Sequence, residues 1–344
     1  MISIIIVSTN TKKLIRECIK SIVESGGECE IVVVDNASTD GTIEALEEYS
    51  RKFLPSRQAG ANAARKPKKD TAPLPTLKLI KNQTNLGYTK SNNIGAKNAT
   101  CSHLVFLNPD TTILSKNFID KINKFLESNK IKKALKINNK KLGIVGFKFT
   151  NPDGSLQPSA GNFPTLLRIV LHRIPFFRKR LGVQIRDNSF YKKPGLVDWV
   201  SGSGLLVEKE AYKKIGGMDE NIFMYGEDYD LCFRLEKEGY KNYLYPSVRI
   251  MHYDTGKNNP LKKPYKYYAM RKGFAAFLKK HRSALSFNMF LLLVKLEAVM
   301  FLGLLPFRNY NKLRTMSPRF SRSLNKSIKS LWKKHLLMST HITS

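Results

Sequence analysis

The first 107 residues alternate between short apolar runs and amphipathic helical patterns, and this alternation constrains the fold most. The apolar runs are rich in β-branched residues, which predicts buried strands, and the spacing between them has helical periodicity. Such an order indicates an α/β domain with a parallel, doubly wound sheet. The predicted strands are Ile2–Val7, Ile31–Val34, Leu77–Ile80 and Leu104–Leu107, with helical patterns at 14–23, 43–49 and 91–99 between them.

Polar residues follow these predicted strands, and ligands of such sheets bind beyond the carboxyl ends of the strands. After the second strand, Asp35 begins DNASTDGT and is placed to accept a hydrogen bond from a base imide or a ribose hydroxyl. Ser38 and Asp40 in that segment could instead be turn and cap residues. After the third strand, Gly87 in NLGYTKSNNIG permits a close backbone approach.

The fourth predicted strand runs into the segment NPDT, in which Asp110 lies just past the end of the strand. A carboxylate there is suited to Mg²⁺, which typically uses one or two carboxylates plus substrate phosphates. The alternative is a Pro-Asp turn that caps a helix after Ser115. His252 follows another strand-like run, Val248–Ile250, and is either a further metal ligand or a structural histidine.

Five acids lie close together in an otherwise basic chain, in the segment Gly216–Leu235. Glu227 and Asp228 follow a glycine and precede an amphipathic helical pattern. A carboxylate at a helix start is a candidate for accepting a proton during catalysis. Glu227 could alternatively orient a ligand or pair with an arginine.

The net charge of the chain is +32, from 59 Lys and Arg against 27 Asp and Glu. Residues 257–344 hold 19 of these basic residues and one acid, Glu297, a local excess of 19 − 1 = +18. Such a region is expected to meet an anionic partner, either lipid headgroups or nucleic acid. The plain alternative is a solvated basic surface.

Two segments near the C-terminus have the character of membrane-surface helices. Ser286–Leu305 is apolar but carries Lys295 and Glu297 near its centre, each costing about 2.5–3.5 kcal/mol inside a bilayer. We therefore expect an interfacial helix or one that packs on the core. Arg319–Lys334 alternates basic with apolar residues, which predicts a basic amphipathic helix and peripheral contact with an anionic membrane.

Three further features of the sequence bear on the fold and the cellular compartment. Residues 51–76 are rich in Ala, Pro and Lys without apolar periodicity, which predicts a disordered surface insertion. Four cysteines have no metal-type spacing, and a reducing cytosolic compartment fits them. The opening MISIIIVST has no basic region before its short apolar run, so it predicts a buried strand and not a signal peptide.

Taken together, these segments resemble the inverting family 2 glycosyltransferases with the GT-A fold, in particular the rhamnosyltransferase-like branch. The resemblance extends from about Ile4 to Tyr253 and rests on an ordered set of motifs. They are VDNASTDGT (34–42), NLGYTKSNNIG (85–95), FLNPDT (106–111), NPDGSLQPS (151–159), DWVSGSGLLV (198–207), the GGMDE and GEDYDLCFRL block (216–235) and His252-Tyr253.

The resemblance implies a role for each matching residue. Asp228 is expected to deprotonate the acceptor hydroxyl, with Glu227 beside it, and Asp110 to hold the metal with His252. The residues expected to line the nucleotide, donor-sugar and acceptor sites are Thr9, Asp35, Asn36, Asn85, Gly87, Asn108, Trp199, Ser201 and Gly202. Two departures weaken the match: Val7-Ser8-Thr9-Asn10 replaces an Asn-Tyr-Asn, and Asn108 stands where many relatives have a second Asp.

The implied protein has a GT-A domain at 1–256 and a basic helical region at 257–344. Its expected activity is transfer of a sugar from a nucleotide-diphosphate donor to a glycan or polyprenyl-linked acceptor, with inversion and with Mg²⁺ or Mn²⁺. The resemblance favours dTDP-rhamnose as donor, with UDP-sugars second, and surface-polysaccharide assembly as the process. The expected location is cytoplasmic, at the inner face of the cell membrane.

Two other functions stay open on the sequence. High positive charge also suits nucleic-acid binding, although no DNA- or RNA-binding signature is present and no nucleic-acid partner is expected. Sugar-phosphate transfer or nucleotidyl transfer on a similar sheet is the other alternative.

Overall fold

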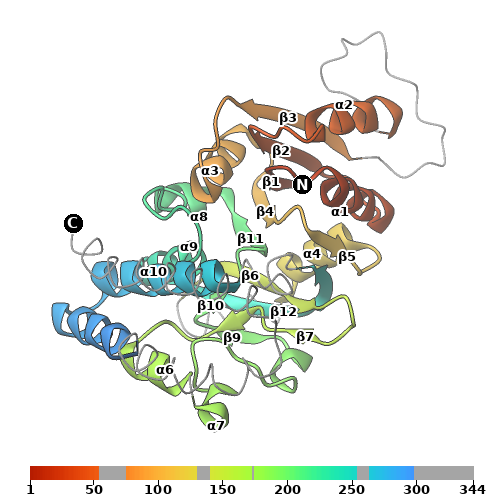
Figure 1. Cartoon of the computed structure of the whole chain (residues 1–344). Coiled ribbons are helices and arrows are strands. Elements are labelled where there is room, and N and C mark those ends of the chain that lie inside the picture. Colours follow the sequence, from red (N-terminus) through yellow and green to blue (C-terminus); the bar gives the residue numbers. More distant parts are fainter. Residues whose placement is uncertain (54–74, 130–139, 173, 254–262, 298–344) are drawn as a thin grey trace, which may run out of the picture. The chain divides into compact units, whose positions relative to one another are not determined.

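The computed structural model describes residues 1–53, 75–129, 140–172, 174–253 and 263–297 (Figure 1). The chain divides into two units. Residues 1–163 and 168–255 form the first, and residues 164–167 and 256–344 form the second. Most of the predicted insertion at 51–76, and all of the predicted helix at 319–334, lie outside the described residues. At the edges of that insertion, residues 51–53 end a helix and Thr76 begins a strand.

A ten-stranded sheet forms the centre of the first unit, with a main path in the order β3-β2-β1-β4-β11-β6-β12-β5. The neighbours β3, β2, β1 and β4 are parallel, whereas β11 is antiparallel to both β4 and β6. The sheet is therefore mixed, with a parallel N-terminal half. The strands on this path are β1 (Ile2–Ser8), β2 (Glu30–Asn36), β3 (Thr76–Asn82), β4 (His103–Leu107), β5 (Thr111–Ile113), β6 (Lys141–Thr150), β11 (Gly204–Glu208) and β12 (Tyr240–His252).

Helices cover both faces of the parallel half because successive strand residues point to opposite faces. On one face, Ile4 and Ile6 of β1 share a buried cluster with Ile15 and Ile19 of α1 (Lys12–Ser25). On the other face, Ile5 lies against Gly95 of α3 (Tyr88–Asn98). This two-sided cover is what the strand-helix alternation predicts.

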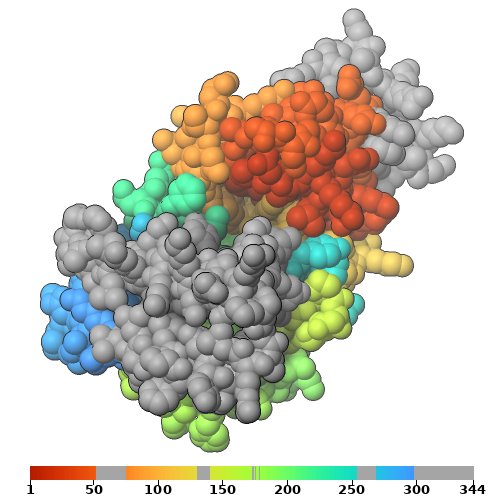
Figure 2. Space-filling model, in the orientation of Figure 1, coloured from red at the N-terminus to blue at the C-terminus, as the bar shows by residue number. Residues whose placement is uncertain are grey.

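The C-terminal half of the first unit adds shorter elements to the same sheet. β7 (Leu156–Gln157) pairs with β6, β9 (Gly195–Val197) pairs with β12, and β8 (Ala160–Gly161) and β10 (Trp199–Val200) form a separate two-stranded sheet. The helices are α2 (Thr42–Phe53), α4 (Phe118–Glu127), α6 (Leu166–Leu171), α7 (Pro175–Arg178), α8 (Lys209–Lys214) and α9 (Glu227–Lys237), with a 3₁₀ turn at Phe190–Lys192. In Figure 2 the red and orange surface belongs to the N-terminal elements, from β1 to α3.

The described part of the second unit is helical. It contains α10 (Lys263–His281) and a helix at 284–297, joined by a short bend. Arg271 and Glu297 form an ion pair between these helices, with both side chains largely buried. Among the described residues no helix has both the length and the apolar composition needed to cross a bilayer.

Candidate active site

Neighbouring parallel strands bring several of the predicted site residues to one edge of the sheet. Ser8 at the end of β1 pairs in register with Asp35 of β2, so Thr9 lies just beyond this level. On the other side of β1, Ile6 pairs with Leu107, the last residue of β4. Thr9, Asn36 and Asn108 therefore lie at the carboxyl ends of three adjacent parallel strands, on the same edge of the sheet.

Asn36 is buried and organises the loop after β3. Its Oδ1 accepts three hydrogen bonds and its Nδ2 donates two, so the side chain is fully used inside the protein. The donors to Oδ1 are Asn82 Nδ2 (3.0 Å), Leu86 N (3.0 Å) and Ser91 Oγ (2.9 Å), and the acceptors of Nδ2 are Asn85 Oδ1 (3.0 Å) and Gly87 O (3.2 Å). Asn36 and Asn85 hold this loop in shape, and their predicted contact with a nucleotide stays a prediction.

Gly87 permits a close contact between this loop and the segment before α9. Its φ of 83° lies in the left-handed region, and a Cβ atom there would be 2.6 Å from the ring of Phe223. Tyr88 N also donates to Phe223 O at 3.2 Å. A larger residue at position 87 would push this segment away from α3.

Asp35 is fully buried and forms a local turn. Its carboxylate accepts from Ser38 N at 2.8 Å and from Ser38 Oγ at 2.6 Å. Asp40 accepts from Thr42 N and from Lys12 N, both at 3.1 Å, at the starts of α2 and α1. Ser38 and Asp40 are therefore turn and cap residues. The predicted contact between Asp35 and a base stays a prediction.

Asp110 and His252 come together from β5 and β12, which pair at Thr111 and His252. The distance between Asp110 Oδ1 and His252 Nε2 is 3.2 Å, and both side chains are mostly buried. Asp110 precedes a strand, and α4 begins only at Phe118, with Asn117 as its N-cap residue. The alternative in which a Pro-Asp turn caps that helix is therefore wrong.

Hydrogen bonds around His252 fix its tautomer. Gln157 Nε2 donates to the carbonyl oxygen of His252 at 3.2 Å and to Asn151 Oδ1 at 3.1 Å. Gln157 Oε1 is thus the acceptor for His252 Nδ1, at 2.7 Å. Because Nδ1 carries a proton, Nε2 faces Asp110 either as a bare nitrogen or, in the imidazolium, as a second N–H. A bare Nε2 beside a carboxylate oxygen is a donor pair for a divalent cation.

These two side chains fit a metal whose remaining ligands come from elsewhere. The carboxylate oxygen suits Mg²⁺ or Mn²⁺, the imidazole nitrogen suits a transition metal, and Mg²⁺ is usually held by few protein ligands plus phosphates. The described residues contain no group of three or more His, Cys, Asp or Glu side chains arranged to hold an ion. A metal at Asp110 and His252 would need substrate or water oxygens to complete its coordination.

Asn108 connects the Asp110 loop to the start of β11. Its main-chain N–H donates to Ser203 O at 3.1 Å, and its Nδ2 donates to Ser203 Oγ at 3.0 Å. In the part of the chain that the structure describes, Asn108 Oδ1 is buried without a hydrogen-bond partner. An unused buried acceptor at this place is consistent with a ligand contact.

Glu227 and Asp228 begin α9, directly after two residues with positive φ. Tyr225 has a φ of 64° and Gly226 a φ of 105°. Such conformations are uncommon for a residue like tyrosine and turn the chain sharply into the helix. Both acids lie against Gly202: a Cβ atom there would be 3.5 Å from Glu227 Oε1 and 3.6 Å from Asp228 Cβ.

The surroundings raise the pKa of both carboxyl groups. Burial is the largest cause for Glu227, and the neighbouring Asp228 adds to it. Burial also raises the pKa of Asp228, while hydrogen bonds from the main-chain N–H groups of Tyr229 and Gly202 act in the opposite direction. Glu227 Oε2 is buried without a hydrogen-bond partner among the described residues. Main-chain hydrogen bonds at Tyr225 and Glu227 also lower the pKa of Glu227, but burial and Asp228 outweigh them, so both carboxyl groups have pKa values above those of solvated acids.

The alternative in which Glu227 pairs with an arginine finds no support among the described contacts. The arginine of this helix, Arg234, donates from Nε to Asp230 Oδ2 at 2.7 Å and from Nη1 to Ile215 O at 2.7 Å. Asp230 is fully buried, so this pair anchors α9 from inside the fold.

Trp199 packs on Tyr229 of α9, and Ser201 lies in the turn between β10 and β11. The Trp199 indole nitrogen donates to Asn162 O at 3.0 Å and to Val183 O at 3.1 Å, and its ring meets Tyr229 edge-on at 6.0 Å. Ser201 Oγ accepts from Ser203 N at 3.4 Å. The polar groups of Trp199 are used internally, and its predicted place beside the donor sugar stays a prediction.

The two predicted chemical centres share one region of the first unit. Asp110 lies two residues after Asn108, which bonds Ser203, and the residue before Ser203, Gly202, lies against Asp228. Tyr88 adds a further link, because its hydroxyl donates to Gly202 O at 2.8 Å. The side chains expected to bind metal and to remove a proton therefore adjoin the same short turn between β10 and β11.

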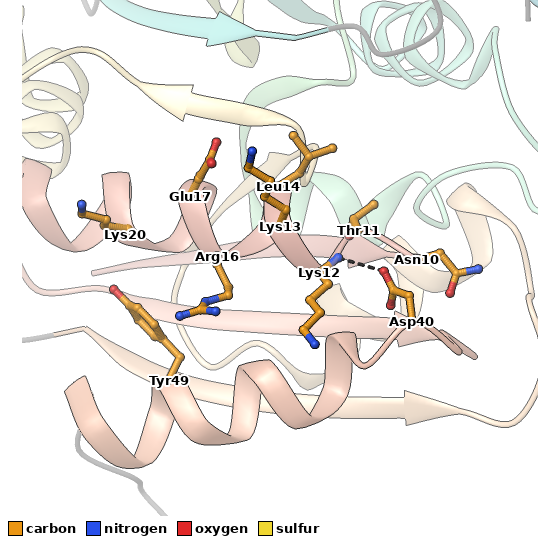
Figure 3. Close-up of a pocket in the computed structure, with 10 residues that line it drawn as sticks. All are labelled: Asn10, Thr11, Lys12, Lys13, Leu14, Arg16, Glu17, Lys20, Asp40 and Tyr49. Carbon is orange, nitrogen blue, oxygen red and sulfur yellow. Dashed lines mark hydrogen bonds between the residues drawn. The ribbon is translucent and has the colours of Figure 1, made fainter.

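A surface pocket of about 700 Å³ lies elsewhere, between α1 and α2 (Figure 3). None of the predicted site residues lines it, although it is adjacent to Thr9. Its lining is mixed in charge, and Asp40 in its wall accepts from Lys12 N. The lining residues are Asn10, Thr11, Lys12, Lys13, Leu14, Arg16, Glu17, Lys20, Asp40 and Tyr49.

Some residues of the candidate site were not predicted from the sequence. Gln157 orients His252, Ser203 binds Asn108, and Tyr88 binds Gly202. Gln157 and Tyr88 both lie inside motifs of the resemblance, so the motifs indicated the region. No signal in the sequence shows which partner each of them has.

Comparisons with known proteins agree with the sequence resemblance. Residues 3–132 match the model of the family described as "Glycosyl transferase family 2". A curated relative from Mycobacterium tuberculosis (strain H37Rv), "N-acetylglucosaminyl-diphospho-decaprenol L-rhamnosyltransferase", is 39% identical over 114 residues, which are 32% of this chain and 37% of that protein. "Rhamnosyltransferase WbbL" of Escherichia coli K12 is 27% identical over 175 residues, 48% of this chain and 61% of that protein. The chain thus matches between about a third and two thirds of the length of these relatives.

A solved structure shares the fold. The mannosyltransferase PcManGT from Pyrobaculum calidifontis, in complex with GDP-Man and Mn²⁺, superposes with a TM-score of 0.52 at 15% identity, covering 99% of this chain and 84% of that one. This match confirms the GT-A fold expected from the resemblance. The chain therefore carries a glycosyl transferase family 2 domain, related in sequence to rhamnosyltransferases.

Proposed function

We propose that this protein is an inverting glycosyltransferase that moves a sugar, with rhamnose favoured, from a nucleoside diphosphate to a hydroxyl group of a glycan. The observation that carries the proposal is the Glu227–Asp228 pair at Gly202, one residue from the Ser203 contact to the Asp110 loop. We propose that the donor and the acceptor bind next to each other at this turn between β10 and β11.

Asp228 is the proposed base. As the acceptor oxygen attacks the anomeric carbon, the hydroxyl proton passes to Asp228 and the bond from that carbon to the diphosphate breaks. A pKa raised by burial makes this carboxylate a stronger base than a solvated aspartate. Glu227 keeps its own proton, so the buried pair carries one negative charge before the reaction. A single displacement inverts the configuration.

Asp110 and His252 are the proposed metal ligands, with Gln157 holding the histidine ring. A divalent cation there would offset the negative charge of the leaving diphosphate. Asn108 Oδ1 is a further candidate for contact with the donor or with a water molecule. Thr9, Asp35, Asn36, Asn85 and Gly87 are proposed to shape the nucleotide pocket beside this pair.

The proposed acceptor is a polyprenyl-linked glycan at the cytoplasmic face of the cell membrane, in the assembly of surface polysaccharide. Two observations support it. The Mycobacterium tuberculosis relative is named for a decaprenyl diphosphate acceptor, and residues 257–344 of this chain have an excess of 19 − 1 = +18 charges. A basic region favours an anionic membrane surface. dTDP-rhamnose is the favoured donor, and a UDP-sugar is the alternative.

The test is a panel of nucleotide sugars, scored by release of nucleoside diphosphate with Mn²⁺ or Mg²⁺ and with a chelator. We expect turnover with one donor, dependent on the metal and on an acceptor. Release of free nucleoside diphosphate also separates glycosyl transfer from sugar-phosphate transfer and from nucleotidyl transfer.

A variant pair tests the role of the acid. Asp228→Asn should lower turnover by about 10²–10⁴-fold while nucleotide binding, measured by calorimetry, is retained. Glu236→Gln on the same helix is the matched control, because Glu236 pairs with Lys241 at the surface. Full turnover by Asp228→Asn would exclude the proposed base.

A further inference from the structure

The helix at 284–297 in the second unit exposes a row of large apolar side chains. The exposed fractions are 72% for Leu285, 44% for Met289, 48% for Leu292 and 58% for Leu296. Successive members are four, three and four residues apart, the spacing that keeps side chains on one helix face. We call these four residues the apolar stripe.

The stripe is narrow and continuous. At 100° per residue its members fall within an arc of about 60°, and they extend about 16 Å along the axis. Single exposed leucines are ordinary on protein surfaces, but a contiguous apolar row usually marks a contact surface.

The other side of this helix is already packed. Phe290 is 1% exposed and Leu291 is 9% exposed. Glu297 points away from the stripe, by about 100° from Leu296 on a helical projection, and pairs with Arg271 of α10. The helix is therefore anchored within the second unit by one side, and the stripe is left outward.

The positive charge around the apolar stripe indicates which kind of partner it contacts. Residues 263–297 contain eight Lys and Arg and a single acid, Glu297, a sequence excess of 8 − 1 = +7. That acid is paired inside the unit, whereas Lys295, flanking the stripe, is exposed. An apolar row flanked by positive charge matches the boundary between acyl chains and anionic headgroups. A second copy of the chain would bring two basic surfaces together, which like-charge repulsion opposes.

We propose that the apolar stripe inserts into the headgroup–acyl boundary of an anionic bilayer, with the helix at 284–297 lying parallel to the membrane plane. This inference rests on the proposed function only for its biological purpose, which is to keep the protein at the surface that carries the acceptor. The basic side chains provide long-range attraction, and the stripe provides the contact that persists when salt screens the charges.

The first experiment places a fluorophore on the stripe. The four native cysteines, Cys18, Cys29, Cys101 and Cys232, are all buried, so Leu292→Cys gives one accessible thiol for an environment-sensitive dye. With vesicles of phosphatidylcholine and about 30% phosphatidylglycerol, the emission should shift to the blue and rise several-fold. The matched control is Leu196→Cys, at a leucine that is 53% exposed on β9 of the first unit. An unchanged emission at position 292 while the protein sediments with the vesicles would overturn the proposal.

The second experiment removes the stripe in the full chain by Leu285→Gln, Met289→Gln, Leu292→Gln and Leu296→Gln together. Glutamine is a good helix former, so the thermal midpoint should hold while vesicle partitioning falls at least about tenfold in about 0.5 M salt. Leu196→Gln should partition as the wild type does. If the combined variant partitions normally, or if it only converts a dimer into a monomer, the stripe has another role. Should the combined variant not fold, the labelled Leu292→Cys protein decides alone.

Failure of this proposal and failure of the proposed function give different results. The combined variant should release nucleoside diphosphate at the wild-type rate with a soluble acceptor, and more slowly with an acceptor held in vesicles. If no donor supports turnover but the dye at position 292 responds to vesicles, the membrane contact stands without the transferase activity. If a donor supports turnover but the dye at position 292 does not respond to vesicles, the transferase activity stands and the membrane contact is excluded.

Discussion

Glu227 and Asp228 are adjacent in the chain, yet their side chains have different surroundings. Asp228 accepts main-chain hydrogen bonds, including one from Tyr229 N at 2.8 Å. Glu227 Oε2 is buried without a partner among the described residues. Burial and the charge of Asp228 raise the pKa of Glu227, and main-chain hydrogen bonds at Tyr225 and Glu227 offset only part of that effect. This difference fits the proposal that Glu227 keeps its proton while Asp228 accepts one.

The raised pKa of Glu227 predicts a pH-dependent stability difference. Between the pKa of a solvated glutamate and the raised value in the fold, the native state binds more protons than the unfolded state, so unfolding becomes easier as pH rises. Glu227→Gln removes this titration. The thermal midpoint of the wild type should fall relative to Glu227→Gln as pH rises from about 5 to about 8. Thermal unfolding at a series of pH values measures it, and a difference independent of pH would contradict it.

The hydrogen bond between Gln157 and His252 predicts an effect on the binding of the proposed metal ion. It holds His252 Nδ1 at 2.7 Å, and outer partners of this kind usually change metal affinity about 10–100-fold when removed. Gln157→Ala should weaken Mn²⁺ binding by that order, measured calorimetrically with nucleoside diphosphate present. Gln184→Ala is the control, because the side chain of Gln184 accepts a hydrogen bond from Arg186 at the surface. Equal affinities for the two variants would exclude Gln157 as a positioning residue.

At the scale of elements, the sequence patterns predict individual strands of the sheet but not how distant strands pair. Ile2–Val7 and Leu104–Leu107 are read correctly as β1 and β4 because each run is buried on both faces. The antiparallel entry of β11 between β4 and β6 joins Gly204 to Leu107, far apart in the chain. Local periodicity contains no information on such pairing, so the mixed half of the sheet, and with it the contact of Ser203 with Asn108, was not predicted.

Helix α3 gives a prediction in which packing outweighs helix propensity. Replacing a helical glycine by alanine normally stabilises a helix by up to about 1 kcal/mol. At Gly95, however, a Cβ atom would be 2.5 Å from Ile5 Cγ2, and Ile5 is completely buried. Overpacking of this kind costs about 1–3 kcal/mol, so Gly95→Ala should lower the free energy of unfolding. Urea denaturation measures it, with Lys97→Ala on the same helix as control; a stabilised Gly95→Ala protein would contradict the predicted packing.

At the scale of the whole molecule, charge is distributed unevenly along the chain. Residues 257–344 account for +18 of the total +32, which leaves 32 − 18 = +14 for residues 1–256. This asymmetry is read directly from the sequence, and it predicts an anionic partner for the C-terminal region. The sequence did not predict the apolar stripe, because apolar residues lie all round the segment Ser286–Leu305, and only the burial of Phe290 and Leu291 and the Arg271–Glu297 pair show which side is packed.

This asymmetry predicts how a shortened chain would bind membranes. Residues 298–344 contain nine Lys and Arg and no acid, whereas the apolar stripe lies wholly before them. Each basic residue near an anionic surface contributes about 1 kcal/mol at most, and salt screens that attraction. A chain of residues 1–297 should therefore bind anionic vesicles more weakly than the full chain at low salt. At about 0.5 M salt, where the apolar contact remains, the two chains should bind alike. Sedimentation with vesicles over a range of salt concentrations measures both, and an identical salt dependence would mean that the charge of residues 298–344 takes no part in membrane binding.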